Sequence, residues 1–265
     1  MPRQVTAFSN ATVKQLRSLR DKKARRSEGL FLAEGLRILT EARDSGRLPE
    51  IIAFSPEGAK HPLAAEIIAA TEAAGGDAIE TSADILSKMS GKDNPQMLLG
   101  AYRQPETRLE RIDRRTAPLW IVTQALRDPG NIGTILRTGD AVGAGGLILI
   151  DDSADPYSVE AVRASMGAIF TQAVAAARWE EFLPWLRSGD GQLVGTSLKA
   201  SRDYLEAEYR RPCFLLIGNE QQGLPADYEA ECDLLVKIPM AGRADSLNAA
   251  MATAVMAFAI TASWR

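Results

Sequence analysis

Short apolar runs alternate with helical patterns along the second half of the chain. The runs that predict strands are residues 119–122, 147–150, 171–175, 192–195, 214–217 and 234–238. Apolar residues at helical spacing predict helices over residues 132–142, 159–166, 180–187 and 247–263. This alternation favours an α/β fold in which a mostly parallel sheet has helices on both faces. Ligands of such sheets bind at the carboxyl ends of the strands, so candidate chemistry is sought in the loops that follow strands.

The first half predicts a separate, smaller α/β domain over residues 1–104. Apolar residues at helical spacing among many cations predict a helix over residues 13–26. Residues 105–118 are polar, charged and bounded by prolines, which is typical of a linker. The second domain is then expected to span residues 119–265.

Three loops after predicted strands carry small and polar residues. In the first, Asn131 is a candidate N-cap for a helix that carries Arg137. The second, residues 218–224, has a glycine near each end, which permits close backbone approach to a ligand. The third offers Ser246 as the N-cap of the last helix, with Asn248 in its first turn. Taken singly, each loop fits a plain turn or a helix start as well as it fits a site.

Charge is distributed unevenly, although the net charge of the 265-residue chain is only −3. Residues 1–47 hold eleven Lys or Arg against five Asp or Glu. A basic end on an acidic body suggests a nucleic-acid-binding arm, and the alternative is a solvated helix face. The densest cationic run contains Lys22, Lys23, Arg25 and Arg26, which are the candidate nucleic-acid contacts.

Cysteine and histidine are scarce. The chain contains Cys213, Cys232 and His61 and no others. A zinc site needs about four nitrogen or sulfur ligands, so we expect no metal, and no histidine-based acid–base catalysis. Low cysteine content fits a reducing cytoplasm. The longest apolar stretch is shorter than the roughly 20 residues that cross a bilayer, so no membrane span is expected.

Together the three loops are more specific than each one alone. The segments NIGTILR (131–137), IGNEQQGL (217–224) and IPMAGRADSLNAA (238–250) resemble, in order and approximate spacing, the signature motifs of the SpoU (TrmH) RNA methyltransferases of the SPOUT superfamily. The stretch EGLFLAEG (28–35) is similar to the ribosomal-protein-like substrate-binding domain found in the ribosomal RNA branch of that family.

This resemblance implies a C-terminal deep trefoil knot, a homodimer with the active site near its interface, and methyl transfer from S-adenosylmethionine to a ribose 2′-oxygen of RNA. The residues implied to hold the cofactor are Ile217, Gly218, Asn219, Gly223, Ile238, Met240 and Leu247. The residues implied at the reaction are Arg137, Asn131, Glu220, Ser246 and Asn248. A guanidinium holds its proton too tightly to be a good general base. We therefore expect Arg137 to bind phosphate and polarise the hydroxyl, with Glu220 orienting it.

Other classes of function stay open on the sequence. A non-catalytic RNA-binding or ribosome-assembly protein could share the fold, although the intact motifs argue against it. A nucleotide-dependent oxidoreductase is disfavoured because the chain lacks GxGxxG. Among methyltransferase substrates, the extra N-terminal domain favours 23S ribosomal RNA over transfer RNA. The target nucleotide and a role in antibiotic resistance are not decided by these residues.

Overall fold

The computed structural model describes residues 2–265. Contacts divide the chain into two compact units. The first unit contains the chain up to Pro105 together with Tyr157–Thr171, and the second contains Glu106–Pro156 and Gln172–Arg265. The domain borders drawn from the sequence stay a prediction, from which the structure differs in two segments described below.

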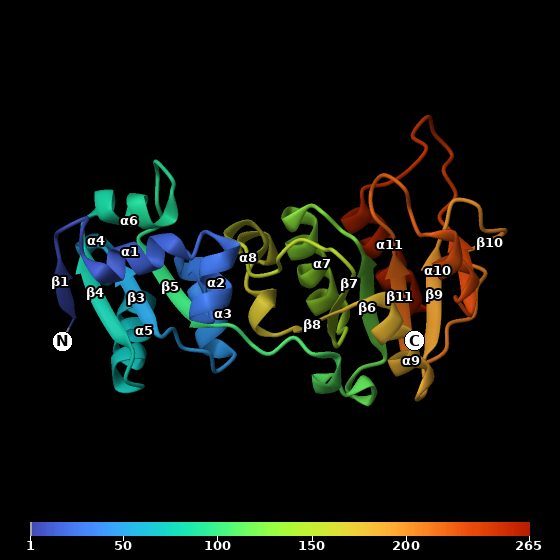
Figure 1. Ribbon diagram of the computed structural model, residues 1–265, viewed down its shortest axis with the longest axis horizontal. Helices are drawn as coiled ribbons and strands as arrows, with labels where there is room; N and C mark the ends of the chain where they lie inside the picture. Colours follow the sequence, from blue (N-terminus) through green and yellow to red (C-terminus); the bar gives the residue numbers. More distant parts are fainter. Residues whose placement is uncertain (1) are drawn as a thin grey trace. The chain divides into compact units, whose positions relative to one another are not determined.

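The first unit is built on a five-stranded sheet in the order β1-β4-β3-β5-β2 (Figure 1). Its strands are β1 (Arg3–Val5), β2 (Leu30–Glu34), β3 (Ile51–Phe54), β4 (Asp77–Thr81) and β5 (Leu98–Arg103). Its helices are α1 (Ala11–Ser18), α2 (Lys22–Glu28), α3 (Leu36–Asp44), α4 (Pro56–Ala59), α5 (Pro62–Ala73), α6 (Ala83–Ser90) and α8 (Val159–Ser165). Strand β4 pairs in parallel with β1 and β3, whereas β5 is antiparallel to both of its neighbours. Helices α1 and α6 contribute their apolar residues to the core on one face of the sheet.

The cationic stretch forms two helices and not the single helix expected over residues 13–26. The Asp21 carboxylate caps the second helix by accepting a hydrogen bond of 2.7 Å from Lys23 N. The Arg25 guanidinium turns inward and donates to the carbonyl oxygens of Leu19 and Arg20, at 2.9 and 2.8 Å. Because it satisfies these carbonyls between the helices, Arg25 is only 3% exposed. The expectation that Arg25 contacts a nucleic acid is therefore wrong.

The second unit is built on a seven-stranded sheet in the order β10-β12-β9-β11-β6-β7-β8. Its strands are β6 (Leu119–Gln124), β7 (Gly146–Ile150), β8 (Ala173–Ala177), β9 (Gln192–Thr196), β10 (Arg202–Asp203), β11 (Cys213–Ile217) and β12 (Leu234–Lys237). Its helices are α7 (Pro129–Val142), α9 (Trp179–Arg187), α10 (Ala226–Ala230) and α11 (Ala249–Ala262). Neighbouring strands are parallel throughout, which confirms the expected parallel sheet.

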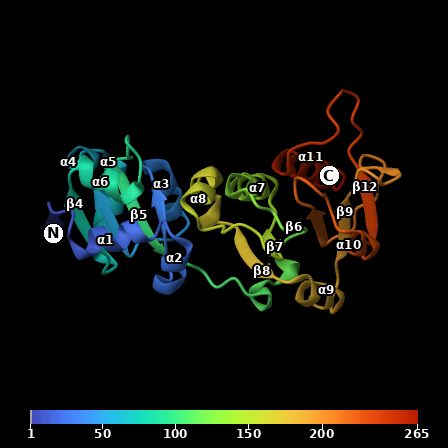
Figure 2. The same cartoon turned by 45° about the horizontal axis from the view of Figure 1, so that its top comes forward.

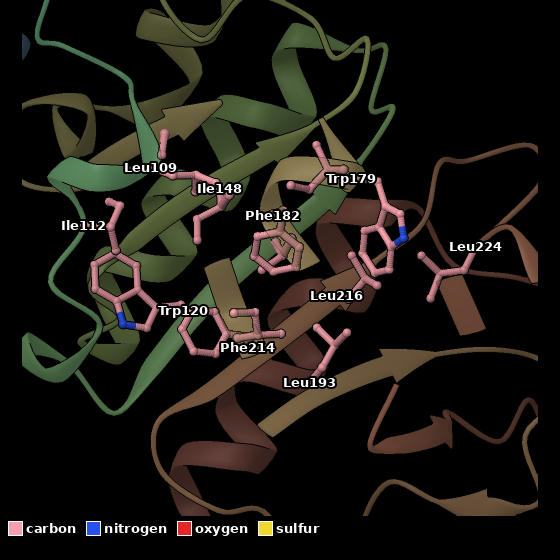
Figure 3. Packing of buried hydrophobic residues seen from close by; sticks show 14 residues of the cluster. Leu109, Ile112, Trp120, Ile148, Trp179, Phe182, Leu193, Phe214, Leu216 and Leu224 are labelled. Atoms are coloured by element: carbon pink, nitrogen blue, oxygen red, sulfur yellow. The ribbon is translucent and has the colours of Figure 1, made fainter. Parts of the chain in front are cut away.

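Helices cover both faces of this second sheet, as expected. Figure 2 shows α9 and α11 on opposite sides of it. The face toward α9 carries a continuous apolar core in which Trp120, Phe182 and Phe214 meet (Figure 3). On the other face, α11 packs on α7 and contacts β11 and β6. The carboxyl ends of these central strands therefore lie beside the first turns of α7 and α11.

The segment expected to be a linker is part of the second unit. Leu109 and Ile112 are 6% and 9% exposed and belong to the core on the α9 face. The Arg114 guanidinium donates to the carbonyl oxygen of Leu186 at 2.8 Å and lies 4.1 Å from the centre of the Trp185 ring. Two buried apolar side chains and one arginine thus attach this segment to the second unit, although its overall composition predicts a free linker.

The segment Tyr157–Thr171 lies in the expected second domain by sequence but packs within the first unit. Aromatic contacts hold it there: the ring centres of Phe31 and Tyr157 are 5.0 Å apart, and those of Tyr102 and Phe170 are 4.7 Å apart. The first unit therefore includes a helix, α8, that the chain supplies from between β7 and β8.

Candidate functional site

The first motif begins a helix one turn earlier than expected. Asp128 is the N-cap of α7, because its side chain accepts a hydrogen bond of 2.7 Å from Gly130 N and Pro129 occupies the first helical position. Asn131 is not the cap but lies inside the first turn, 7% exposed. Its amide is therefore free to bond with side chains from other loops.

The third motif differs in the opposite direction, because its helix begins two residues later than expected. Asn248 is the N-cap of α11, accepting hydrogen bonds from the backbone N–H groups of Ala250 and Met251 at 2.9 and 3.3 Å. Ser246, the expected cap, lies before the helix, and its hydroxyl donates to the neighbouring Asp245 carboxylate at 3.2 Å. The cap fixes the Asn248 side chain and leaves its amide nitrogen available.

A chain of side-chain hydrogen bonds joins all three motifs. Asn248 Nδ2 donates to Asn131 Oδ1 at 3.0 Å. Asn131 Nδ2 donates in turn to Glu220 Oε1 at 2.8 Å. Segments that lie more than 80 residues apart in the sequence are thus connected through one buried amide, which uses both its donor and its acceptor.

The second motif forms a tight loop between β11 and α10. Gly223 N donates to the carbonyl oxygen of Asn219 at 3.1 Å, and Gly223 has a φ of +68°. The Asn219 side chain accepts from the backbone N–H groups of Gln221 and Gln222. A Cβ at Gly218 would lie 2.2 Å from the carbonyl carbon of Gly223, so only glycine fits where the loop closes on itself.

A cavity of about 340 Å³ lies at the carboxyl ends of β9, β11 and β12. Its volume is within the range of roughly 300–1,000 Å³ typical of small-molecule sites. All seven residues expected to hold the cofactor line it, namely Ile217, Gly218, Asn219, Gly223, Ile238, Met240 and Leu247. Glu220 and Ser246 line it as well. The structure thus gathers the second and third motifs around one hollow.

Sequence reasoning missed one wall of this cavity. Residues 196–199, at the carboxyl end of β9, contribute to the lining. The available signal was their position directly after a predicted strand, where ligands of parallel sheets bind. The lining also includes Lys199 and Lys237 together with the carboxylates of Glu229 and Asp245. The cavity therefore offers charges of both signs.

Arg137 lies outside the lining of this cavity. It is exposed on α7, six residues beyond Asn131, and makes no ion pair with any of residues 2–265. The expected hydrogen bond between Glu220 and Arg137 is absent from the described part of the chain, and Glu220 Oε1 accepts from Asn131. The guanidinium is thus available to a partner from outside this chain.

Lys22, Lys23 and Arg26 are exposed on α2. Cys213 is buried, and burial raises the pKa of its thiol to about 12. Residues 2–265 contain no group of three His, Cys, Asp or Glu side chains that could hold a metal ion. Within the same residues, no helix is long and apolar enough to cross a membrane.

Comparison with known families gives two matches along the chain. Residues 118–258 match the SpoU rRNA Methylase family, and residues 10–100 match the MRM3-like substrate binding domain. The chain is 33% identical to the 23S rRNA (uridine(2479)-2′-O)-methyltransferase of Streptomyces viridochromogenes, over 96% of this chain and 90% of that protein. It is 28% identical to the 23S rRNA (guanosine(2553)-2′-O)-methyltransferase of Bacillus subtilis, over 97% of this chain and 98% of that protein.

Comparison with solved structures gives the same result. The crystal structure of an AdoMet-bound rRNA methyltransferase from Sinorhizobium meliloti superposes with a TM-score of 0.91 at 39% identity. The superposition covers 99% of this chain and 98% of that one. The similarity therefore includes both units and is not limited to the second.

Proposed function

Because the chain belongs to the SpoU rRNA Methylase family, we propose that it transfers a methyl group from S-adenosylmethionine to a ribose 2′-oxygen of 23S ribosomal RNA. The observation that carries this proposal is the hydrogen-bond chain from Asn248 through Asn131 to Glu220. It joins the three motifs beside a cavity of suitable size. A chance resemblance of three short segments would give no reason for their side chains to meet.

The cavity suits the proposed cofactor. S-adenosylmethionine carries a flat aromatic purine, a cationic sulfonium and a zwitterionic amino-acid end. The lining supplies apolar side chains from Ile217 and Ile238, carboxylates from Glu220 and Glu229, and the cation of Lys237. The cofactor supplies an activated methyl group, so the chain's own residues need mainly to align the acceptor hydroxyl and exclude water.

Arg137 is the residue proposed to meet the RNA at the reacting nucleotide. Its exposed guanidinium has no partner within residues 2–265, and a planar fork of N–H groups matches a phosphate. Guanidinium does not release its proton readily, so the role proposed is to bind phosphate and polarise the 2′-hydroxyl. Asn131, Asn248 and Glu220 would act by fixing the loops, and Ser246 by contacting the ligand from the cavity wall.

A second copy of this chain is proposed to complete the site. Arg137 lies outside the cavity lining, and α11 exposes apolar side chains on one stripe. Met251 is 63%, Val255 36% and Phe258 54% exposed, at helical spacing along that stripe. Covering the stripe with the same helix of a partner would bury it and could bring a second Arg137 toward the cavity. We also expect the loops at residues 218–224 and 238–248 to form the family's trefoil knot.

The ribosomal substrate is favoured over transfer RNA. Both relatives named above are 23S rRNA methyltransferases. This chain covers 90% and 98% of their lengths, and the match includes the region of the substrate-binding domain. Their target nucleotides differ, a uridine in one and a guanosine in the other, so neither target is transferred to this chain. A ribosomal substrate would place the reaction in the cytoplasm.

The decisive experiment incubates the purified chain with ribosomal RNA, transfer RNA and labelled S-adenosylmethionine. We expect label in 23S RNA alone, at one position that becomes resistant to alkaline hydrolysis. Label in transfer RNA would show that the substrate is transfer RNA, and the proposed methyl-transfer reaction would still stand. Binding of S-adenosylmethionine with no transfer to any RNA would support a non-catalytic protein on the same fold.

A further inference from the structure

Two non-glycine residues adopt left-handed backbone conformations at neighbouring strand ends of the second unit. Ala125, directly after β6, has a φ of +48°, and Asp151, directly after β7, has a φ of +60°. Each of these residues donates a backbone hydrogen bond to the last residue of the neighbouring strand. Ala125 N donates to Ile150 O at the end of β7, and Asp151 N donates to Ala177 O at the end of β8. Such conformations cost energy and persist only where surrounding contacts enforce them, often near functional sites.

The contacts that enforce this geometry converge on the Asp151 carboxylate. Oδ1 accepts a hydrogen bond of 3.1 Å from the backbone N–H of Trp179, which is the first residue of α9. Oδ2 accepts from the Tyr228 hydroxyl at 2.9 Å and from Gln124 Nε2 at 3.3 Å. One half-buried carboxylate thus ties the ends of β6 and β7 to α9 and α10.

The Tyr228 side chain is held on two sides. Its ring stacks on the Trp179 ring, with 3.9 Å between the ring centres and 10° between the planes. Trp179 itself belongs to the apolar core of the second unit (Figure 3). Desolvation and the nearby Asp151 carboxylate raise the pKa of the Tyr228 phenol, so its hydroxyl stays protonated and donates.

Tyr228 in turn is coupled to the cavity. It lies in α10, the short helix that follows the second-motif loop after a single proline, Pro225. Leu224 at the end of that loop and Glu229, the residue after Tyr228, both line the cavity. The loop is closed at Gly218 and held at Glu220 by Asn131, so α10 is its third point of attachment.

We infer that Asp151, acting through Tyr228, is a positioning residue for the cofactor cavity. It lies outside the three motifs and touches no lining residue by a side-chain hydrogen bond, yet its carboxylate anchors α10, which carries the lining residue Glu229 and directly follows the loop that ends at Leu224 and Pro225. Removing this anchor should loosen the cavity wall there and weaken S-adenosylmethionine binding. The inference rests on the proposed function for the identity of the ligand.

The test removes only the hydroxyl, with Tyr228→Phe, and measures S-adenosylmethionine binding by isothermal titration calorimetry. We expect the dissociation constant to rise roughly three- to tenfold, because only a part of the stabilisation lost with a hydrogen bond to a charged group is transmitted to the cavity wall. Tyr209→Phe is the matched control. It removes a hydroxyl that donates to Tyr204 O at 2.6 Å in the same unit, but this bond lies within residues 202–212, none of which lines the cavity. The control should leave the dissociation constant within twofold.

A double-mutant cycle separates positioning from general destabilisation. Asp151→Gly deletes the carboxylate and keeps a residue that tolerates positive φ. If the two side chains act through one hydrogen bond, the double variant should bind S-adenosylmethionine no more weakly than Asp151→Gly alone. At saturating cofactor, the turnover of Tyr228→Phe should stay within twofold of the parent, so the effect appears in KM.

Several results would overturn the inference. They are an unchanged dissociation constant in Tyr228→Phe, an equal rise in Tyr209→Phe, or additive effects in the double variant. A parent protein that binds S-adenosylmethionine but methylates no RNA would end the proposed function and leave this inference standing. A parent that binds no S-adenosylmethionine would end both.

Discussion

The Asn131 side chain makes two hydrogen bonds, one as donor and one as acceptor, that no other residue type can make at once in this geometry. Its amide nitrogen donates to Glu220 and its amide oxygen accepts from Asn248. Asn131→Asp keeps the shape but sets a carboxylate against Glu220, which leaves a buried acceptor facing an acceptor. We expect the free energy of unfolding to fall by about 1–3 kcal/mol, measured by urea denaturation.

A suitable control for this substitution is Asn10→Asp. Asn10 caps α1 by accepting from Thr12 N at 2.9 Å, and aspartate caps helices equally well. The control should therefore leave stability within about 0.5 kcal/mol. Equal stability losses in the two variants would show that the network through Asn131 contributes nothing special.

Arg137 is expected to serve the reaction and not the cofactor. Because it lies outside the cavity lining and bonds with no described residue, its removal should not disturb the cavity. Arg137→Ala should lose at least about 100-fold in single-turnover methyl transfer, the scale of a lost electrostatic contact at a reacting group. The dissociation constant of S-adenosylmethionine, measured by calorimetry, should stay within twofold. A matching loss of cofactor binding would contradict this division of roles.

At the scale of the element, the second-motif loop depends on the absence of a side chain at one position. A Cβ at Gly218 would lie 2.2 Å from the Gly223 carbonyl carbon, a contact that only a backbone shift can relieve. Gly218→Ala should therefore open the loop and raise the dissociation constant of S-adenosylmethionine more than tenfold. Gly242→Ala is the control, because a Cβ there would meet no atom within 4 Å. Similar affinities for the two alanine variants would remove this loop from the site.

The elements themselves were largely predictable, because apolar runs between turn signals specify buried parallel strands. The six strands expected in the second unit are all present. The strand β10 was not predicted, because it is two residues long, lies at the sheet edge and contains no apolar run. Helix starts were less predictable. Asp128 and Asn131 are both good caps, as are Ser246 and Asn248, so residue type alone cannot choose between them.

Burial of polar side chains was the part that the sequence did not reveal. Arg25 stands in a run of cations and resembles its neighbours, yet its guanidinium bonds with two backbone carbonyls and is buried. Asp151 belongs to no recognisable motif, and its importance comes from Trp179 and Tyr228, which are distant in sequence. Such roles depend on tertiary neighbours, so a single sequence carries no local signal for them.

At the scale of the whole molecule, the exposed stripe on α11 predicts self-association. Phe258 and Met251 are 54% and 63% exposed, and covering them would bury apolar area. We expect a dimer by sedimentation equilibrium at micromolar concentration. Phe258→Lys should convert it to a monomer and reduce methyl transfer. Leu205→Lys, at a residue 71% exposed in the loop after β10, should leave the dimer intact. A fully active monomeric parent would refute the dimer.

The exposed cations of α2 predict RNA binding by the first unit. Lys22, Lys23 and Arg26 are exposed on α2, whereas the rest of the chain is acidic on balance and would repel RNA. Changing these three cations to Ala should weaken RNA binding and reduce the slope of log K against log salt by about 0.7 for each lost phosphate contact on single-stranded RNA. The S-adenosylmethionine affinity should not change, because the cavity lies in the second unit.

Arg25→Ala provides the contrast that makes this prediction specific. Its guanidinium bonds with Leu19 O and Arg20 O inside the fold, so its loss should lower the free energy of unfolding by about 1–3 kcal/mol and leave the salt slope of RNA binding unchanged. Nitrocellulose filter binding across a salt series measures the slope, and urea denaturation measures the stability. If the triple variant keeps the parent's affinity and slope, the cations of α2 only solvate an exposed helix face. The attraction for RNA must then come from another surface.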